Sequence, residues 1–281
     1  MMDKLARAVR LDELKSAAFY RDLAVEFFAT FLLLFIVGGL SAQFGDKPSI
    51  VQIGLAAGLG VGLIVWGSAS TSGGHINPAI SLAVCLAGHI TVLRGVGYSI
   101  AQCAGAYAAI LLTKSLTPAD EIGEFYGVTR LNPALTPLQG VVMEVVLTFF
   151  LAFTIYAYVD KERPELNPCG PLMIGLSVTM THMFGVPYTG CSINPARSFG
   201  PALASGYWQD HWIYWVGPIL GSMLAIFSYD YTIRSDASLQ KLKSSLLCSA
   251  PASNADGRDE DNKAIQMNDE GNTDDVQNLT V

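Results

Sequence analysis

The stretch Ile76-Asn-Pro-Ala79 returns in the second half of the chain as Ile193-Asn-Pro-Ala196. In both copies the Asn side chain can cap the free backbone N–H groups of a helix, and Pro suits the first helical position because it has no N–H of its own. The sequence therefore predicts two helix starts. The apolar pieces that begin there, 77–87 and 194–204, are each too short to cross a bilayer.

Other landmarks repeat at nearly the same spacing. Glu26-Phe-Phe-Ala-Thr-Phe-Leu-Leu-Leu-Phe35 returns as Glu144-Val-Val-Leu-Thr-Phe-Phe-Leu-Ala-Phe153, and Gly58 matches Gly175. Each copy contains three longer apolar stretches, so the second copy starts from the opposite side of the membrane and the repeat is inverted. The predicted fold class is an all-α membrane protein with six transmembrane helices plus two half-helices.

The composition agrees with a membrane protein. Of 281 residues, 51% are hydrophobic and 15% charged, which is more apolar than a water-soluble domain. Six stretches are long and apolar enough to span a bilayer. They are 23–40, 50–66, 93–112, 138–159, 170–184 and 212–232.

The charges and cysteines exclude several classes of protein. The net charge is −7, but 251–281 holds 8 acids and only 2 bases, so the rest of the chain is nearly neutral and offers no basic surface for nucleic acid. The five cysteines show no CxxC spacing, and we expect no metal site and no cofactor. Lys and Arg collect on the side that holds both termini, which predicts cytoplasmic termini, with the plasma membrane as the default location.

The inverted repeat brings the two Asn-Pro-Ala helix starts together near the middle of the membrane. Each helix N-terminus carries roughly half a positive elementary charge, so a passage between them repels cations. A water molecule there turns its oxygen toward the helix N-termini, which interrupts proton transfer along the single row of water molecules in the passage. Backbone carbonyls before each start would replace the hydrogen bonds that water leaves behind. The expected carbonyls are those of Gly73, Gly74, His75, Ile76, Gly190, Cys191, Ser192 and Ile193.

Across 23–232 the sequence resembles the aquaporin (major intrinsic protein) family. The resemblance includes both Asn-Pro-Ala boxes, the longer stretch Asn194-Pro-Ala-Arg-Ser-Phe-Gly200, and the two repeat-leading acids Glu26 and Glu144. It implies a pore in every subunit, a homotetramer, and central residues Asn77, Pro78, Ala79, Asn194, Pro195 and Ala196.

The resemblance also divides the chain. The basic residues place an N-terminal segment 1–22 in the cytoplasm, and the resemblance implies an aquaporin-like channel domain 23–232, whose repeats cover about 23–112 and 138–232. The remaining 233–281 reads as an acidic, largely disordered cytoplasmic tail. Its ending Leu279-Thr-Val281 could add a strand to a PDZ-type groove, a weak partner hypothesis.

The family builds its narrowest point from four positions, which fall here on Ala57, His182, Cys191 and Arg197. Arg197 is the only base in the membrane part, and an intramembrane charge indicates function. Cys191 is expected to turn its thiol toward the passage and react with mercurials. Ala57 departs from the pattern, because water-selective relatives that carry His and Cys usually have Phe there. The absence of that ring puts strict exclusion of small neutral solutes in doubt.

Two pairs of residues have expected structural roles. The acids Glu26 and Glu144 should hold the loops that lead into the half-helices, with His75 as a candidate partner. Gly58 and Gly175 should let two helices approach closely.

Three functions remain open from the sequence: a passive water channel, a broader channel that also passes glycerol or urea because of Ala57, and a non-conducting structural or adhesion protein. The lipid bilayer is the expected surrounding. No cluster of acid, base and nucleophile outside the passage suggests an enzyme.

Overall fold

The computed structural model describes residues 10–42, 47–123, 126–160 and 168–233, all of them within one compact unit that runs from Met1 to Ser235. Within these ranges the regular structure is helical, apart from a single bridge between Ala42 and Ile122. The long helices are α2 (Ala17–Gly39), α3 (Ile50–Ser72), α5 (Val92–Leu116), α6 (Pro137–Val159), α7 (Gly170–Thr189) and α9 (Ile213–Ser228), and the two half-helices are α4 (Pro78–Leu86) and α8 (Pro195–Ser205).

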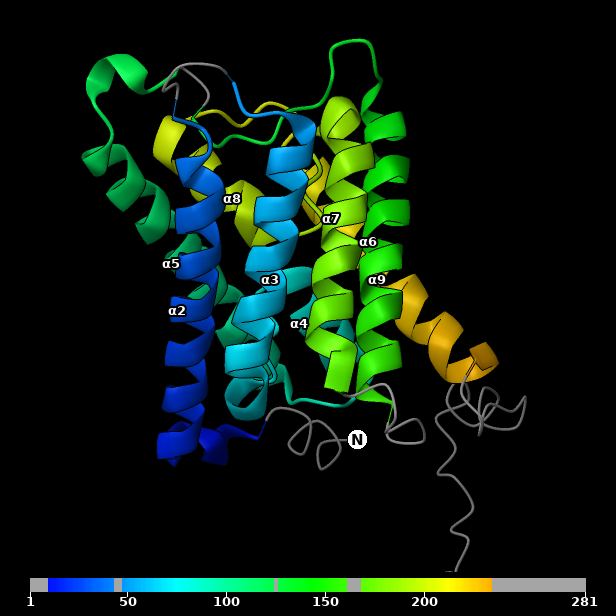
Figure 1. The fold of residues 1–281 in the computed structure, drawn as a ribbon. Coiled ribbons are helices and arrows are strands. Elements are labelled where there is room, and N and C mark those ends of the chain that lie inside the picture. Colours follow the sequence, from blue (N-terminus) through cyan, green and yellow to red (C-terminus); the bar gives the residue numbers. More distant parts are fainter. Residues whose placement is uncertain (1–9, 43–46, 124–125, 161–167, 234–281) are drawn as a thin grey trace, which may run out of the picture. The chain divides into compact units, whose positions relative to one another are not determined.

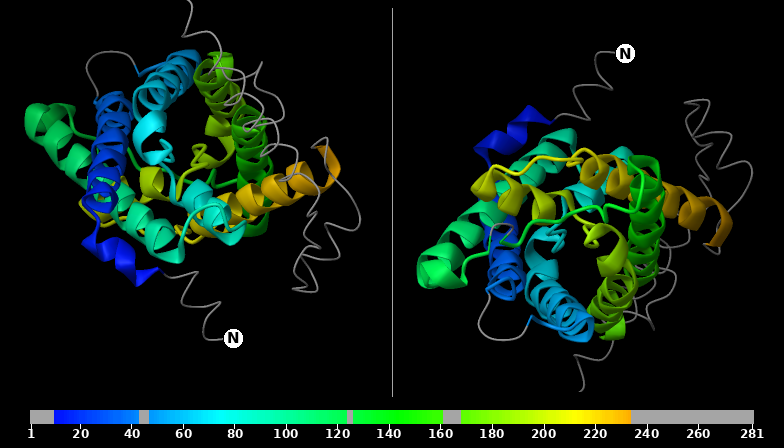
Figure 2. Two further views of the ribbon diagram at one scale, coloured as in Figure 1. Left: turned by 90° about the horizontal axis from the view of Figure 1, so that it is seen from below. Right: turned by 90° about the horizontal axis from the view of Figure 1, so that it is seen from above.

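The packing of the helices follows the repeat. In the first repeat α2 packs on α5, and in the second α6 packs on α9, while α3 and α7, the middle long helices of the two repeats, pack on each other. Figure 1 shows α8 in the upper half of the bundle and α4 in the lower half. Seen from below and above, the long helices stand around the two half-helices and the non-helical stretches that lead into them (Figure 2). The predicted fold class, six long helices and two half-helices in an inverted repeat, is confirmed.

Four of the long helices, α2, α3, α5 and α6, are long and apolar enough by themselves to cross a membrane. The other two are less apolar or shorter. Helix α7 has 20 residues but buries polar groups such as Thr181 and His182 on its inner face. Helix α9 has 16 residues and continues as a π-helical turn, η4 (Tyr229–Ile233). Both expose large apolar side chains outward, including Met180 and Leu220, as a surface against lipid requires.

Several helices extend beyond the hydrophobic stretches that predict them. Helix α3 continues past Trp66 to Ser72, and α7 continues past Phe184 to Thr189. Both end at a left-handed glycine, Gly73 with φ 96° and Gly190 with φ 78°, where a residue with a Cβ is disfavoured. Hydropathy marks only the apolar part of such a helix, because its last turn carries polar residues that the interior uses.

Helix α2 starts at Ala17, before the predicted boundary at residue 23. Its first turns are held by charged groups as well as by the buried ring of Phe19. Arg94, at the start of α5, donates to Asp22 at 2.6 Å and pairs with Glu13 of the short helix η1 (Leu11–Lys15) at 3.2 Å. The segment 1–9 and the acidic tail 234–281, with its PDZ-type ending, lie outside the described residues.

The contact between α3 and α7 is closest at Gly58 and Gly175. A Cβ on Gly58 would lie 1.9 Å from Thr179 Oγ1 and 2.4 Å from the carbonyl oxygen of Gly175. A Cβ on Gly175 would in turn lie 2.6 Å from the carbonyl oxygen of Gly58. The two backbones therefore touch directly, and this contact sets the spacing of two helices that carry residues of the central cavity.

We expect Gly58→Ala to destabilise the protein by about 1–3 kcal/mol, because the new methyl group must push the two backbones apart. The measurement is the thermal unfolding midpoint of the detergent-purified protein. The matched control is Gly67→Ala on the same helix, where an added Cβ meets nothing within 4 Å. The control should keep or raise the midpoint, since Ala favours helix over Gly. Equal midpoints for the two variants would contradict the close contact.

Candidate functional site

The two half-helices meet at their N-terminal ends through a reciprocal pair of hydrogen bonds. Asn77 caps α4 by accepting from the backbone N–H of Ala79 at 2.9 Å, and Asn194 caps α8 by accepting from Ala196 at 3.0 Å. The amide nitrogen of Asn77 donates to the carbonyl of Ile193 at 2.7 Å. The amide nitrogen of Asn194 donates to the carbonyl of Ile76 at 2.8 Å. The repeats are thus joined at their centre, and each amide has a second hydrogen that these bonds do not use.

The backbone before each half-helix adopts left-handed conformations at equivalent positions. Gly74 and Ile76 have φ 61° and 45°, and their counterparts Cys191 and Ile193 have φ 53° and 45°. A β-branched side chain such as Ile rarely tolerates this region, which costs on the order of 1–3 kcal/mol per residue unless the surroundings enforce it. Such conformations cluster at functional sites. The enforcement here comes from buried hydrogen bonds to two carboxylates, described below.

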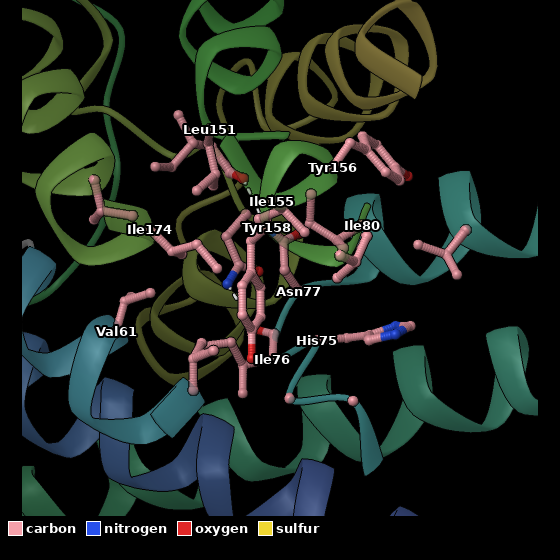
Figure 3. Close-up of a pocket in the computed structure, with 18 of the residues that line it drawn as sticks. Val61, His75, Ile76, Asn77, Ile80, Leu151, Ile155, Tyr156, Tyr158 and Ile174 are labelled. Carbon is pink, nitrogen blue, oxygen red and sulfur yellow. Dashed lines mark hydrogen bonds between the residues drawn. The ribbon is translucent and has the colours of Figure 1, made fainter. Parts of the chain in front are cut away.

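A cavity of about 510 Å³ runs past this meeting point. Toward α8 its wall includes His182 and Arg197, and toward the far end of α4 it includes Tyr156, Tyr158 and Tyr229. Figure 3 shows aliphatic side chains from several helices around the same space as Asn77. Most of the remaining wall is aliphatic, so polar groups face the cavity at only a few places. The aliphatic residues include Leu33, Val37, Val61, Val65, Ile80, Leu151, Ile155, Ile174 and Val178.

Six of the eight residues whose carbonyls the sequence predicts along the passage line the cavity: Gly73, Gly74, His75 and Ile76 before α4, and Ser192 and Ile193 before α8. The other two, Gly190 and Cys191, are not among its lining residues. The carbonyls of Ile76 and Ile193 also accept the asparagine bonds, so each has one remaining lone pair for another donor. Pro78, Ala79, Pro195 and Ala196 lie behind the lining, in the first turns of the half-helices.

Three of the four residues predicted to form the narrowest point line the cavity together: Ala57, His182 and Arg197. The ring of His182 is held by a bond between its Nδ1 atom and the carbonyl of Val178 at 2.9 Å. The fourth residue, Cys191, is fully buried, and its sulfur lies 3.2 Å from where a Cβ on Gly185 would be. The sequence predicts a thiol that faces the passage, whereas this thiol packs against α7. Its sensitivity to mercurials stays a prediction.

Arg197 is positioned by the connection between α5 and α6. Its Nη1 atom donates to the carbonyl of Gly127 at 3.2 Å and to the hydroxyl of Thr129. The hydroxyls of Thr129 and Ser198 are hydrogen-bonded at 2.8 Å, and Ser198 donates to Ser192 at 2.7 Å. The Nε atom of Arg197 is buried and has no protein partner among the described residues.

The geometry of paired half-helices around one cavity agrees with the comparisons. The model of a family described as "Major intrinsic protein" matches residues 13–229. The chain belongs to the major intrinsic protein family. Its similar relatives include aquaporin-2 of Homo sapiens, 42% identical over 223 residues (79% of this chain, 82% of the relative). Aquaporin-4 of Mus musculus is 39% identical over 229 residues (80% of this chain, 71% of the relative).

The similar solved structures include an aquaglyceroporin from Plasmodium falciparum, with a TM-score of 0.67 at 27% sequence identity, which covers 76% of this chain and 97% of that one. Members named aquaporin and aquaglyceroporin therefore both resemble this chain. The relatives are aquaporin channels, and this member of the major intrinsic protein family is an integral membrane transport protein.

In this major intrinsic protein, two fully buried carboxylates hold the loops in their left-handed conformations. Glu26 accepts from the hydroxyl of Ser72 at 2.6 Å and from the backbone N–H groups of His75 and Ile76 at 2.9 and 2.7 Å. His75 therefore binds the acid through its backbone, while its ring Nδ1 lies 3.1 Å from Ser81 Oγ. These bonds satisfy an acid that would otherwise be costly to bury.

Glu144 makes the same contacts in the second repeat. It accepts from the hydroxyl of Thr189 at 2.6 Å and from the backbone N–H groups of Ser192 and Ile193 at 2.9 and 2.8 Å. Glu144 has one hydrogen-bond donor fewer than Glu26. Gln102 of α5 donates to Glu26 at 2.8 Å, whereas the matching position in α9 is Pro218, which has no donor.

Three functional residues of the site were not predicted: Gly127, Thr129 and Gln102. Gly127 and Thr129 lie in an irregular connection, where no periodicity indicates which atoms reach the membrane interior. The repeat could have revealed Gln102, because it aligns with Pro218 at the spacing of the other landmarks and a buried amide in a spanning helix indicates a hydrogen-bonding partner.

We expect Glu26→Gln to lower the thermal unfolding midpoint and the water permeability together. A glutamine offers one acceptor oxygen and turns an NH2 group toward donors, so at least one buried N–H or O–H loses its partner at a cost of about 1–3 kcal/mol each. Thermal unfolding in detergent and light scattering from reconstituted liposomes measure the two effects. The control Asp120→Asn replaces an exposed acid and should change neither quantity. An unchanged midpoint for Glu26→Gln would contradict the role of the carboxylate.

Proposed function

We propose that this chain is a passive water channel, driven by osmotic gradients, that excludes protons and ions. The observation that carries the proposal is the reciprocal pair of asparagine bonds beside the cavity. It brings the N-terminal ends of α4 and α8 together while leaving one N–H of each amide unused. Two neighbouring donors suit the oxygen of a water molecule, which accepts two hydrogen bonds.

The electrostatics of the site favour neutral solutes. Each half-helix contributes roughly half a positive elementary charge at its N-terminal end, and Arg197 adds a full charge on the α8 side of the cavity. A cation that approaches this centre meets repulsion in a medium of low dielectric constant, where charges interact strongly. A water molecule held by its oxygen at Asn77 and Asn194 points its hydrogens away on both sides, so no continuous proton relay crosses the centre.

The arrangement of the wall supports rapid passage. Carbonyls of the two loops and a few polar side chains supply hydrogen-bonding groups, whereas the many aliphatic side chains of the wall offer none. Water therefore gives up part of its hydrogen bonding at each step and does not find a site deep enough to trap it. We assign the selectivity of the α8 end to Ala57, His182 and Arg197, which line the cavity, and the central constriction to the two asparagines.

Ala57 favours a second candidate function, a broader channel that also passes glycerol or urea. Its side chain is a single methyl group in the wall beside His182. A larger side chain there would fill the space that a polyol carbon needs. A solved structure similar to this chain is titled as an aquaglyceroporin, so both solute classes occur among similar proteins.

We also propose a homotetramer in the plasma membrane with both termini in the cytoplasm. Large apolar side chains are exposed along the long helices, among them Leu63, Trp66 and Ile100, so lipid or neighbouring subunits must cover them. A PDZ-type partner at the C-terminus remains a hypothesis from the sequence.

The test is osmotic shrinkage of liposomes that contain the purified chain, followed by light scattering. With sucrose as the impermeant osmolyte, liposomes with the protein should shrink at least about tenfold faster than empty ones at low temperature, where the bilayer itself conducts slowly. Shrinkage at the rate of empty liposomes would leave only the non-conducting structural or adhesion role. Rapid reswelling when glycerol replaces sucrose would favour the broader channel.

We expect Ala57→Phe to reduce glycerol or urea flux more than water flux, because the ring fills space beside His182 and Arg197. The measurement is the ratio of solute permeability to water permeability in the same liposomes. A control variant, Leu63→Phe, enlarges an exposed side chain of the same helix and should leave the ratio unchanged. Equal reductions of both fluxes by Ala57→Phe would show that residue 57 does not select between solutes.

A further inference from the structure

Aromatic side chains also line the cavity at the end opposite Arg197. Tyr158 lies in the last turn of α6 and lines the cavity together with Val65, Ile155 and Ile174. In the close-up, Tyr158 stands in the middle of the labelled lining residues, whereas the ring of Tyr156 and the ring of His75 lie at the edge of the group (Figure 3). Of the labelled aromatic residues, Tyr158 is therefore the one drawn centrally among the lining side chains in this view.

The position of the Tyr158 ring depends on a glycine. A Cβ on Gly170, the first residue of α7, would lie 1.8 Å from Cδ2 and 2.3 Å from Cε2 of Tyr158. No other residue type could occupy position 170 without moving the ring. Two residues beyond Tyr158, the carboxylate of Asp160 accepts from the hydroxyl of Tyr229 at 3.0 Å, which ties the end of α6 to η4. The backbone near Tyr158 is thus held in place, and its ring packs closely against Gly170.

The surroundings of Tyr158 make this end a suitable place for selection. The cavity is also lined by the polar residues Tyr156, Asp160, Tyr229 and Asp230, but Val65, Ile155 and Ile174 offer no hydrogen-bonding group in their side chains. A polyol squeezed between these side chains and an aromatic ring cannot satisfy all its hydroxyl groups, and each unsatisfied one costs free energy. Water is small enough to keep contact with its neighbours in the file. At the other end, Ala57 leaves the wall with a small side chain where selection would otherwise act.

We propose that Tyr158 forms a second constriction at the α4 end of the cavity and is a specificity-determining residue that excludes small polyols, with Gly170 as its positioning residue. This inference rests on the proposed water-channel function. It assigns to the α4 end the discrimination that Ala57 weakens at the α8 end.

The test compares water permeability, measured with sucrose, and glycerol permeability, measured by reswelling, in liposomes that contain each variant. Tyr158→Ala should raise the ratio of glycerol to water permeability about tenfold, the scale of discrimination that a well-fitted apolar contact provides. Tyr158→Phe keeps the ring and should leave the ratio within about twofold of the wild type. Phe150→Ala removes a ring from the same helix at an exposed position and should have no effect.

The variant Gly170→Ala tests separately whether Gly170 positions the ring of Tyr158. If it acts by displacing the ring, it changes the ratio in the wild-type background but has no further effect once Tyr158 is alanine, because residues that act through one contact are not additive. Additive effects of the two substitutions would overturn the role of Gly170.

The measurements distinguish failure of the proposed water-channel function from failure of the proposed constriction at Tyr158. Wild-type liposomes that shrink no faster than empty ones would overturn the water channel and the constriction with it. Wild-type liposomes that conduct water, with an unchanged glycerol-to-water ratio in Tyr158→Ala, would leave the water channel standing and overturn the constriction. Light-scattering traces are compared at equal amounts of reconstituted protein, so a variant that folds poorly lowers both fluxes and leaves their ratio interpretable.

Discussion

The reciprocal bonds between the two asparagines and the two isoleucine carbonyls are the interaction on which the rest of the structure depends. A half-helix has an exposed N-terminal end inside the membrane, where unpaired N–H groups have no water to bind. The caps by Asn77 and Asn194 satisfy these groups, and the amide nitrogens tie each tip to the loop of the other repeat. Without these bonds the loops would expose strained backbone to an apolar interior.

That constraint explains why buried acids are found in this apolar bundle. The left-handed loops direct backbone N–H groups toward the protein, and only a strong acceptor can satisfy several of them at once. Glu26 and Glu144 do this from the first helix of each repeat. Residues of the same loops line the cavity. The cavity lining and the contacts of the buried acids therefore depend on one backbone conformation.

Much of this arrangement could be predicted from the sequence because the repeat relates its two halves. The matching of Glu26 with Glu144, and of one Asn-Pro-Ala box with the other, predicted the inverted architecture, and family membership agrees with it. Hydropathy could not predict the true ends of α3 and α7, since Ser72 and Thr189 are polar residues that bind the carboxylates. The hydrogen-bond partners of Arg197 also could not be predicted from the sequence. Gly127 and Thr129 lie in a connection whose path depends on tertiary packing.

The two loops are anchored by unlike parts of the chain, although the repeat makes them copies. The first is tied to a spanning helix through Gln102, whereas the second has proline at that position and is linked through Ser192 and Ser198 to Thr129 in the connection between α5 and α6. The position of Arg197 therefore depends on a non-helical connection between two helices, whereas the loop of the first repeat depends on a side chain within the bundle itself.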